Sequence, residues 1–82
     1  MSVSHDVRDQ IEKIDQQIVD LIAQRATLYQ EAAEQDEEGM SADHDADTIA
    51  EWEGAADERG LNMTVMGNVC RGILKACRSV GE

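Results

Sequence analysis

The sequence predicts an all-α protein of three helices, one long, one short and one of medium length. Its 82 residues contain no proline and no phenylalanine and are rich in alanine, glutamate and glutamine, which suit helices. No run of β-branched and aromatic residues alternates with polar ones, as a half-buried strand requires. Apolar residues recur instead at steps of three and four, the spacing of an amphipathic helix.

The first predicted helix runs from about Ser4 to Glu38 and carries the clearest apolar stripe. Seven residues fall within about 120° of one another on a helical wheel: Val7, Ile11, Ile14, Ile18, Leu21, Ile22 and Leu28. We expect Ser4 to be the N-cap and Gly39 to end the helix after the acidic run "EQDEEG". At about 1.5 Å per residue, this helix is too long to be covered by two shorter helices of its own chain.

Two further helices are expected, from about Ala42 to Glu58 and from about Met63 to Val80. The link between them contains "RGLN", in which Gly60 fits the left-handed position after a helix and Leu61 fits the hydrophobic residue of a Schellman motif. The third helix is apolar on more than one face, which predicts that it lies between other helices.

One small domain, residues 1–82, is marginally stable by itself, because a chain of this size buries only about 60% of its unfolded surface. Oligomerisation is a common remedy where disulfides and metals are lacking. We therefore expect a partner chain, most simply a second copy of this one.

Charge and cysteine spacing exclude several classes of function. The net charge of −11 repels nucleic acid and anionic membranes. The N-terminal stretch has no hydrophobic run, so we expect no signal peptide, no membrane span and a cytoplasmic location. Cys70 and Cys77 would lie about 10 Å apart on one helix, too far for a disulfide, and are expected to be free core residues. No metal site is expected, because neither these cysteines nor His44 in "DHDAD" has further ligands at a suitable spacing.

Arg25 lies inside the apolar stripe of the first helix. With Ile18 at 0° on the wheel, Arg25 lies at about −20°, near the centre of the stripe. A guanidinium buried there needs an anionic partner, because an unpaired buried charge is very costly. The partner is either a carboxylate of the protein or the carboxylate of a ligand, bound through the two-pronged guanidinium. The position on the helix leaves both interpretations open.

Arg8 lies at the edge of the same face, 17 residues before Arg25 and so about 25 Å from it along the helix. One small ligand cannot contact both arginines of one chain. An antiparallel partner helix would bring Arg8 of one chain to Arg25 of the other. Two arginines that meet across a dimer need a polyanion between them, which indicates a small dicarboxylate and two symmetric sites.

The segment "VRDQIEKIDQQIVDLIAQRATL" resembles the first helix of the all-helical chorismate mutases. The resemblance rests on Arg8, Ile14-Asp15, Ile18, Leu21-Ile22 and Arg25, and it extends more loosely through "ADERGLN" into the third helix. It implies an intertwined helical homodimer that rearranges chorismate to prephenate without a cofactor or a metal. It also implies that Arg25 and Arg8 of the partner chain are the catalytic residues, each binding a carboxylate of the substrate.

Other positions of the family pattern differ in this chain. A lysine and a glutamine, which in the family both reach the ether oxygen of the substrate, fall on Asp36 and Gly81. An arginine and a glutamate at the start of the second helix fall on His44 and Asp45, and a C-terminal serine falls on Cys77. The resemblance therefore implies that His44, Asp45 and Cys77 bind the substrate, while the two donors to the ether oxygen are missing.

Three functions remain open on the sequence alone. The chain is a working chorismate mutase, or an enzyme for a similar dianion, in which Arg59, Arg71 or His44 replaces the lysine. Alternatively, it is a catalytically weak or inactive dimeric homologue that binds a small carboxylate or a partner enzyme, because losing one preorganised donor costs about 10²–10³ in rate. The third alternative is a helical interaction protein whose arginines pair internally.

Overall fold

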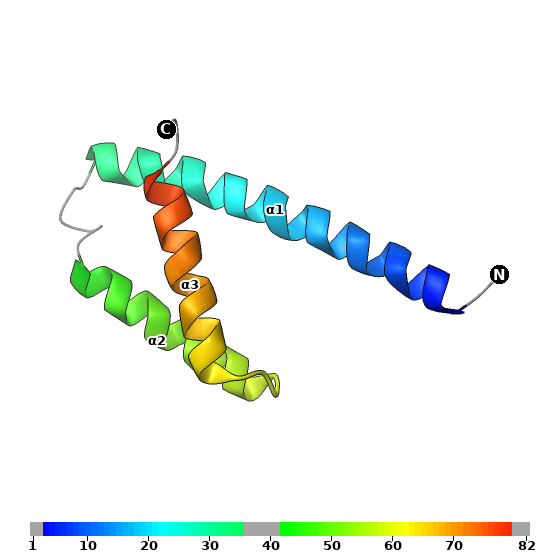
Figure 1. Ribbon diagram of the computed structural model, residues 1–82. Coiled ribbons are helices and arrows are strands. Elements are labelled where there is room, and N and C mark those ends of the chain that lie inside the picture. The colour runs from blue at the N-terminus through cyan, green and yellow to red at the C-terminus, as the bar shows by residue number, and fades with distance from the viewer. Residues whose placement is uncertain (1–2, 36–41, 80–82) are drawn as a thin grey trace.

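A computed structural model describes residues 3–35 and 42–79, which form three helices and no strand. These are α1 (Val3–Gln35), α2 (Ala42–Glu58) and α3 (Met63–Arg78). Helix α3 crosses from the C-terminal half of α1 to α2, and the N-terminal half of α1 extends away from both (Figure 1). The predicted all-α class, with a long, a short and a medium helix, is confirmed.

The helix boundaries agree with the predicted ones except at two ends. Helix α1 begins at Val3, so Ser4 lies within its first turn and is not the N-cap. A cap depends on the backbone angles of a single residue, which apolar periodicity does not constrain. Helix α3 ends at Arg78, because Ser79 leaves the helical conformation and its N–H donates to the carbonyls of the preceding turn. The other predicted end residues, Glu38, Gly39 and Val80, lie outside the described residues.

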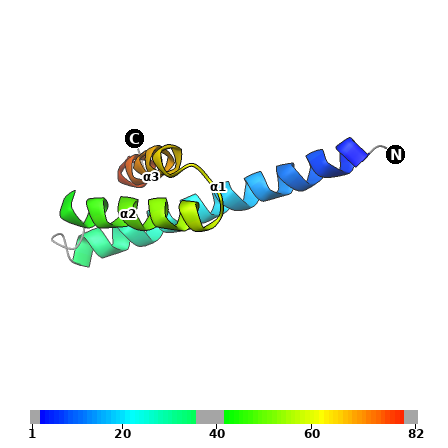
Figure 2. The same cartoon turned by 90° about the horizontal axis from the view of Figure 1, so that it is seen from below.

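The turn between α2 and α3 is a Schellman motif, as predicted. Gly60 has a φ of +74°, the left-handed conformation that glycine adopts without a Cβ clash. The N–H of Leu61 donates to the carbonyl of Ala56 at 2.8 Å, and that of Gly60 donates to Asp57 at 3.1 Å. Asn62 then caps α3, its side-chain oxygen accepting a backbone N–H 2.9 Å away. These bonds hold α3 folded back across α2 (Figure 2).

Helix α3 packs against both α1 and α2, as its apolar faces predict, whereas the described parts of α1 and α2 make no close backbone approach. All the residues buried in this packing are small except Leu74. The small ones are Ala26, Ala56, Gly67, Cys70 and Cys77. Cys70 and Cys77 are free thiols and fully buried, as expected of core residues. With Leu74 as its only large member, the described core of a single chain is too small to hold three helices together.

The N-terminal half of α1 leaves its apolar stripe uncovered. Val7, Ile11, Ile14 and Ile18 are 46–53% exposed. The radius of gyration is 15.5 Å, against about 12 Å for a compact chain of this length. The expectation that α1 exceeds what its own chain can cover is therefore confirmed. In the described residues, no helix combines the length and the apolar character needed to cross a membrane.

A candidate anion pocket at Arg25

The guanidinium of Arg25 is half-buried and has no carboxylate partner within residues 3–35 and 42–79. Its Nη1 donates to the Sγ of Cys77 at 3.3 Å, across the contact between α1 and α3. Among the described residues, no Asp or Glu forms an ion pair with Arg25. A thiol is a weak acceptor, and a guanidinium carries five N–H donors. Cys77 therefore orients Arg25 without neutralising its charge, and the internal ion pair considered from the sequence is not found in this part of the chain.

Arg25 faces a hollow of about 240 Å³ where the three helices meet. Its lining combines apolar side chains with a few polar ones. Helix α1 contributes Arg25, Leu28, Tyr29 and Ala32, α2 contributes His44 and Asp45, and α3 contributes Leu74. A concave site with apolar walls and a few convergent polar groups is typical of small-molecule binding. Since such sites usually enclose about 300 Å³ or more, this hollow needs a further wall to enclose a ligand.

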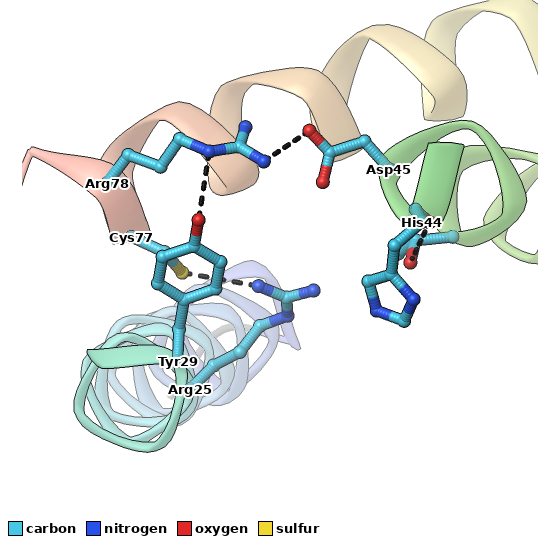
Figure 3. A network of polar contacts seen from close by, with 7 residues as sticks. Arg25, Tyr29, His44, Asp45, Cys77 and Arg78 are labelled. Atoms are coloured by element: carbon cyan, nitrogen blue, oxygen red, sulfur yellow. Dashed lines mark hydrogen bonds and ion pairs between the residues drawn. The ribbon is translucent and has the colours of Figure 1, made fainter. Parts of the chain in front are cut away.

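Arg78, on the last turn of α3, joins the other two helices beside this hollow (Figure 3). Its Nη2 forms an ion pair with Oδ2 of Asp45, at the start of α2. Its Nε donates to the hydroxyl of Tyr29 on α1 at 3.0 Å, and its guanidinium lies 5.6 Å from the centroid of that ring. The hydrogen bond to Asp45 raises the pKa of Arg78. Asp45 and Tyr29 thus line the hollow while both are held by Arg78.

A second polar contact fixes the end of α3 on α1. The amide of Gln30 donates to the backbone carbonyl of Cys77 at 2.9 Å. This carbonyl belongs to the last turn of α3, where carbonyls typically lack a partner within the helix. Together with the bond from Arg25 to the Cys77 thiol, this contact sets the distance between α1 and α3 at the hollow.

The structure brings four of the five predicted site residues together. Arg25, His44 and Asp45 line the hollow, and Cys77 lies against Arg25. In Figure 3 the imidazole of His44 and the guanidinium of Arg25 point toward the same region. Arg8 does not join them, because it belongs to the N-terminal half of α1. That half of the helix extends away from α2 and α3 (Figure 1). The two altered family positions, Asp36 and Gly81, lie outside the described residues.

Sequence reasoning missed Tyr29 and Arg78, although each had a local signal. Tyr29 follows Arg25 by four residues, which puts both on the same helix face. Arg78 follows Cys77 directly and is the last cation of α3. Neither signal reveals that Arg78 joins Tyr29 to Asp45, because these two contacts span 49 and 33 residues.

Of the three cations considered as substitutes for the family's lysine, only His44 lines the hollow. Arg59 donates to the carbonyl of Ala55 at 2.9 Å, and Arg71 donates to the side chain of Asn68 at 3.1 Å. Both bonds join residues close in sequence, and neither Arg59 nor Arg71 lines the hollow. Within residues 3–35 and 42–79, no cluster of three His, Cys, Asp or Glu side chains could hold a metal ion.

A comparison with protein families matches residues 7–82 to the family described as chorismate mutase type II. No curated protein and no solved structure gives a significant match to the chain. The family match spans all three helices and both arginines that carry the resemblance. The chain therefore belongs to the chorismate mutase type II family.

Proposed function

We propose that this chain rearranges chorismate to prephenate, binding the dianion between its own Arg25 and Arg8 of a second copy. The observation that carries the proposal is the half-buried guanidinium of Arg25, which faces a hollow and whose only side-chain partner among the described residues is a thiol. A desolvated cation that no described carboxylate neutralises is suited to bind the carboxylate of a ligand.

A homodimer is supported by the amount of surface that one chain leaves exposed. The accessible surface is 6382 Å², whereas a compact monomer of 9.0 kDa exposes about 4,900 Å². If two chains buried this excess against each other, about 3,000 Å² would be removed from water, within the range of obligate homodimers. The uncovered stripe on α1 (Val7, Ile11, Ile14 and Ile18) is the surface that such a dimer would bury.

The dimer also supplies the second arginine. Arg8 is separated from Arg25 of its own chain by about 25 Å of helix, so it contributes to a site only through a partner. In an antiparallel pair of α1 helices, Arg8 of each chain approaches Arg25 of the other, and the two-fold axis generates two equal sites. The N-terminal half of the partner's α1 would then form the wall that the hollow lacks.

The remaining site residues take roles that follow from their contacts. His44 places an imidazole on the hollow and acts as a cation when protonated. Asp45 uses Oδ2 for Arg78, so its second oxygen can accept a hydrogen bond from a ligand hydroxyl. Cys77 acts through Arg25, which it orients.

The proposed reaction needs no nucleophile, because one bond forms and one breaks within the substrate. The protein contributes by holding the dianion in a compact conformer and by placing cations where negative charge develops. Arg25 and the partner's Arg8 perform the first task. For the second, the described part of the hollow offers only His44, so we expect turnover to be slow.

A dimeric homologue without activity is the second candidate. It is favoured by one observation: Gln30, the residue after Tyr29, donates to the backbone carbonyl of Cys77 rather than to a ligand. Such a protein would bind a small dicarboxylate, or a partner enzyme, through the same arginines.

A turnover assay distinguishes these candidates. Loss of the ultraviolet absorbance of chorismate is measured with and without a bicyclic dicarboxylate that mimics the transition state, for the wild type, Arg25→Ala and Lys13→Ala. Turnover that the mimic inhibits, and that only Arg25→Ala abolishes, supports the enzyme. Absence of turnover with thermal stabilisation by the mimic, again lost only in Arg25→Ala, supports the binding homologue. If the mimic neither inhibits nor stabilises, both candidates are wrong.

A further inference from the structure

We propose that Arg78 is a positioning residue that keeps Asp45 away from Arg25, so that the Arg25 guanidinium stays available to a ligand carboxylate. The inference rests on the proposed function, in that it takes the hollow at Arg25 to be an anion site. It assigns to Arg78 a role that differs from ligand contact and from simple support of the fold.

Among the described residues, Asp45 is the acid that lines the same hollow as Arg25. Both side chains line the same hollow, yet no described contact joins them. Oδ2 of Asp45 is instead paired with Arg78, and Figure 3 shows the carboxylate turned toward that residue. The Asp45 side chain is only 18% exposed, so solvent screens its charge poorly. Without Arg78, Asp45 would be a half-buried anion beside an unpaired cation, and the two would attract each other strongly.

Arg78 is itself held in place from α1. Its Nε–H bonds to the Tyr29 hydroxyl, and its guanidinium lies over the Tyr29 ring. These contacts leave the Nη2 end of the guanidinium directed at Asp45. Arg78 does not line the hollow at Arg25, so a ligand there is not expected to contact it. Its effect on a ligand therefore passes through Asp45.

The ligand-free protein provides the first test. In Arg78→Gln, the Asp45 carboxylate should move to Arg25, which a crystal structure would show as an N–O distance within 4 Å. The Nε–H signal of Arg25 in ¹⁵N spectra should shift in the same variant and return in Arg78→Gln/Asp45→Asn. An Arg25 signal that is identical in the wild type and Arg78→Gln overturns the proposal, whether or not the protein binds any ligand.

Binding of the bicyclic dicarboxylate, measured by calorimetry, provides the second test. We expect Arg78→Gln to weaken binding at least tenfold and Arg78→Lys to retain most of it, because lysine still offers Asp45 a cation. The double variant Arg78→Gln/Asp45→Asn should recover most of the affinity lost in Arg78→Gln. Lys75→Gln is the matched control, since it makes the same change in charge one turn earlier on an exposed part of α3, and it should bind as the wild type does.

The double variant separates the proposal from its alternatives. If Arg78 contacted the ligand directly, or only joined the helices, removing the Asp45 charge as well would restore nothing. A double variant as weak as Arg78→Gln therefore overturns the proposal. If the wild type does not bind the dicarboxylate, the proposed function fails, and the ligand-free spectra still decide whether Arg78 keeps Asp45 from Arg25.

Discussion

Nη1 of Arg25 lies 3.3 Å from Sγ of Cys77, although 52 residues separate them in the chain. This contact explains how a cation occupies the centre of an apolar helix stripe. The thiol is fully buried and accepts one hydrogen bond, which fixes the direction of the guanidinium without adding a negative charge. Arg25 is therefore oriented by the fold, and no carboxylate of the described residues pairs with it, as a site for a ligand carboxylate requires.

Replacing Arg25 by Gln should impair binding much more than stability. Loss of one member of a charge pair typically costs about 2–5 kcal/mol of binding free energy, whereas removing a cation without a carboxylate partner should change the free energy of unfolding by about 1 kcal/mol or less. Calorimetry with the bicyclic dicarboxylate and urea unfolding measure the two quantities. Lys13→Gln, with the same charge change elsewhere on α1, is the control. An Arg25→Gln variant that stays folded and binds as the wild type does, but loses several kcal/mol of unfolding free energy, would favour an internal structural role.

Mixing two inactive variants should restore activity if each site uses arginines from both chains. Arg8→Ala and Arg25→Ala homodimers each lack one arginine at both sites. A mixed dimer has one intact site and one doubly altered site, so random exchange should restore about a quarter of the wild-type activity. Turnover, or dicarboxylate binding if turnover is absent, is measured before and after mixing. No recovery in a mixture shown to contain mixed dimers would show that no site combines Arg25 of one chain with Arg8 of the other.

A charge on the exposed stripe of α1 should break the dimer. Ile14 is 52% exposed in one chain, and Ile14→Asp would place a carboxylate in the proposed interface twice per dimer. We expect the free energy of dimer dissociation to fall by at least about 3 kcal/mol, since the dimer loses two buried isoleucines and each contributes about 1.5–3 kcal/mol. Analytical ultracentrifugation measures the change. Gln16→Asp adds the same charge on the opposite face of the helix and should leave the dimer intact.

Salt should stabilise the folded dimer. Each chain carries a net charge of −11, so folding and pairing bring like charges together. Raising the salt concentration from 0.01 to 1 M shortens the Debye length from about 30 to about 3 Å and screens this repulsion. The melting temperature should therefore rise steeply with KCl at constant protein concentration. A melting temperature that is flat or falls with KCl would show that favourable ion pairs outweigh the repulsion.

Stability should fall at alkaline pH because of Cys70. Burial raises the pKa of this thiol above 9.0, an effect that the nearby Arg25 partly opposes. The unfolded chain then loses the Cys70 proton at a lower pH than the folded chain, so the contribution to stability is complete below pH 9 and is lost as the pH rises above it. Urea unfolding of the wild type and Cys70→Ala between pH 7 and 10 tests this. The wild type should lose more stability above pH 9 than Cys70→Ala does, and parallel profiles would contradict the assignment to Cys70.

The parts of the fold that were predicted correctly depend on local patterns. The bounds of α2 follow from composition and from Gly60, whose left-handed conformation ends the helix whatever the rest of the chain does. The length of α1 and its apolar stripe follow from spacing alone, and they also place Arg25 on the stripe. The ends of α1 and α3 were less predictable, because single-residue caps have weak signals.

Sequence alone therefore determined three helices, an oversized apolar face and a cation within it, since residues three or four apart on a helix must share a face. Only the tertiary structure decided what meets that cation. The packing of α3 between α1 and α2 brings Cys77 to Arg25 and lets Arg78 join Tyr29 to Asp45. Contacts that span 33 to 52 residues depend on how helices pack in three dimensions, which no local spacing specifies.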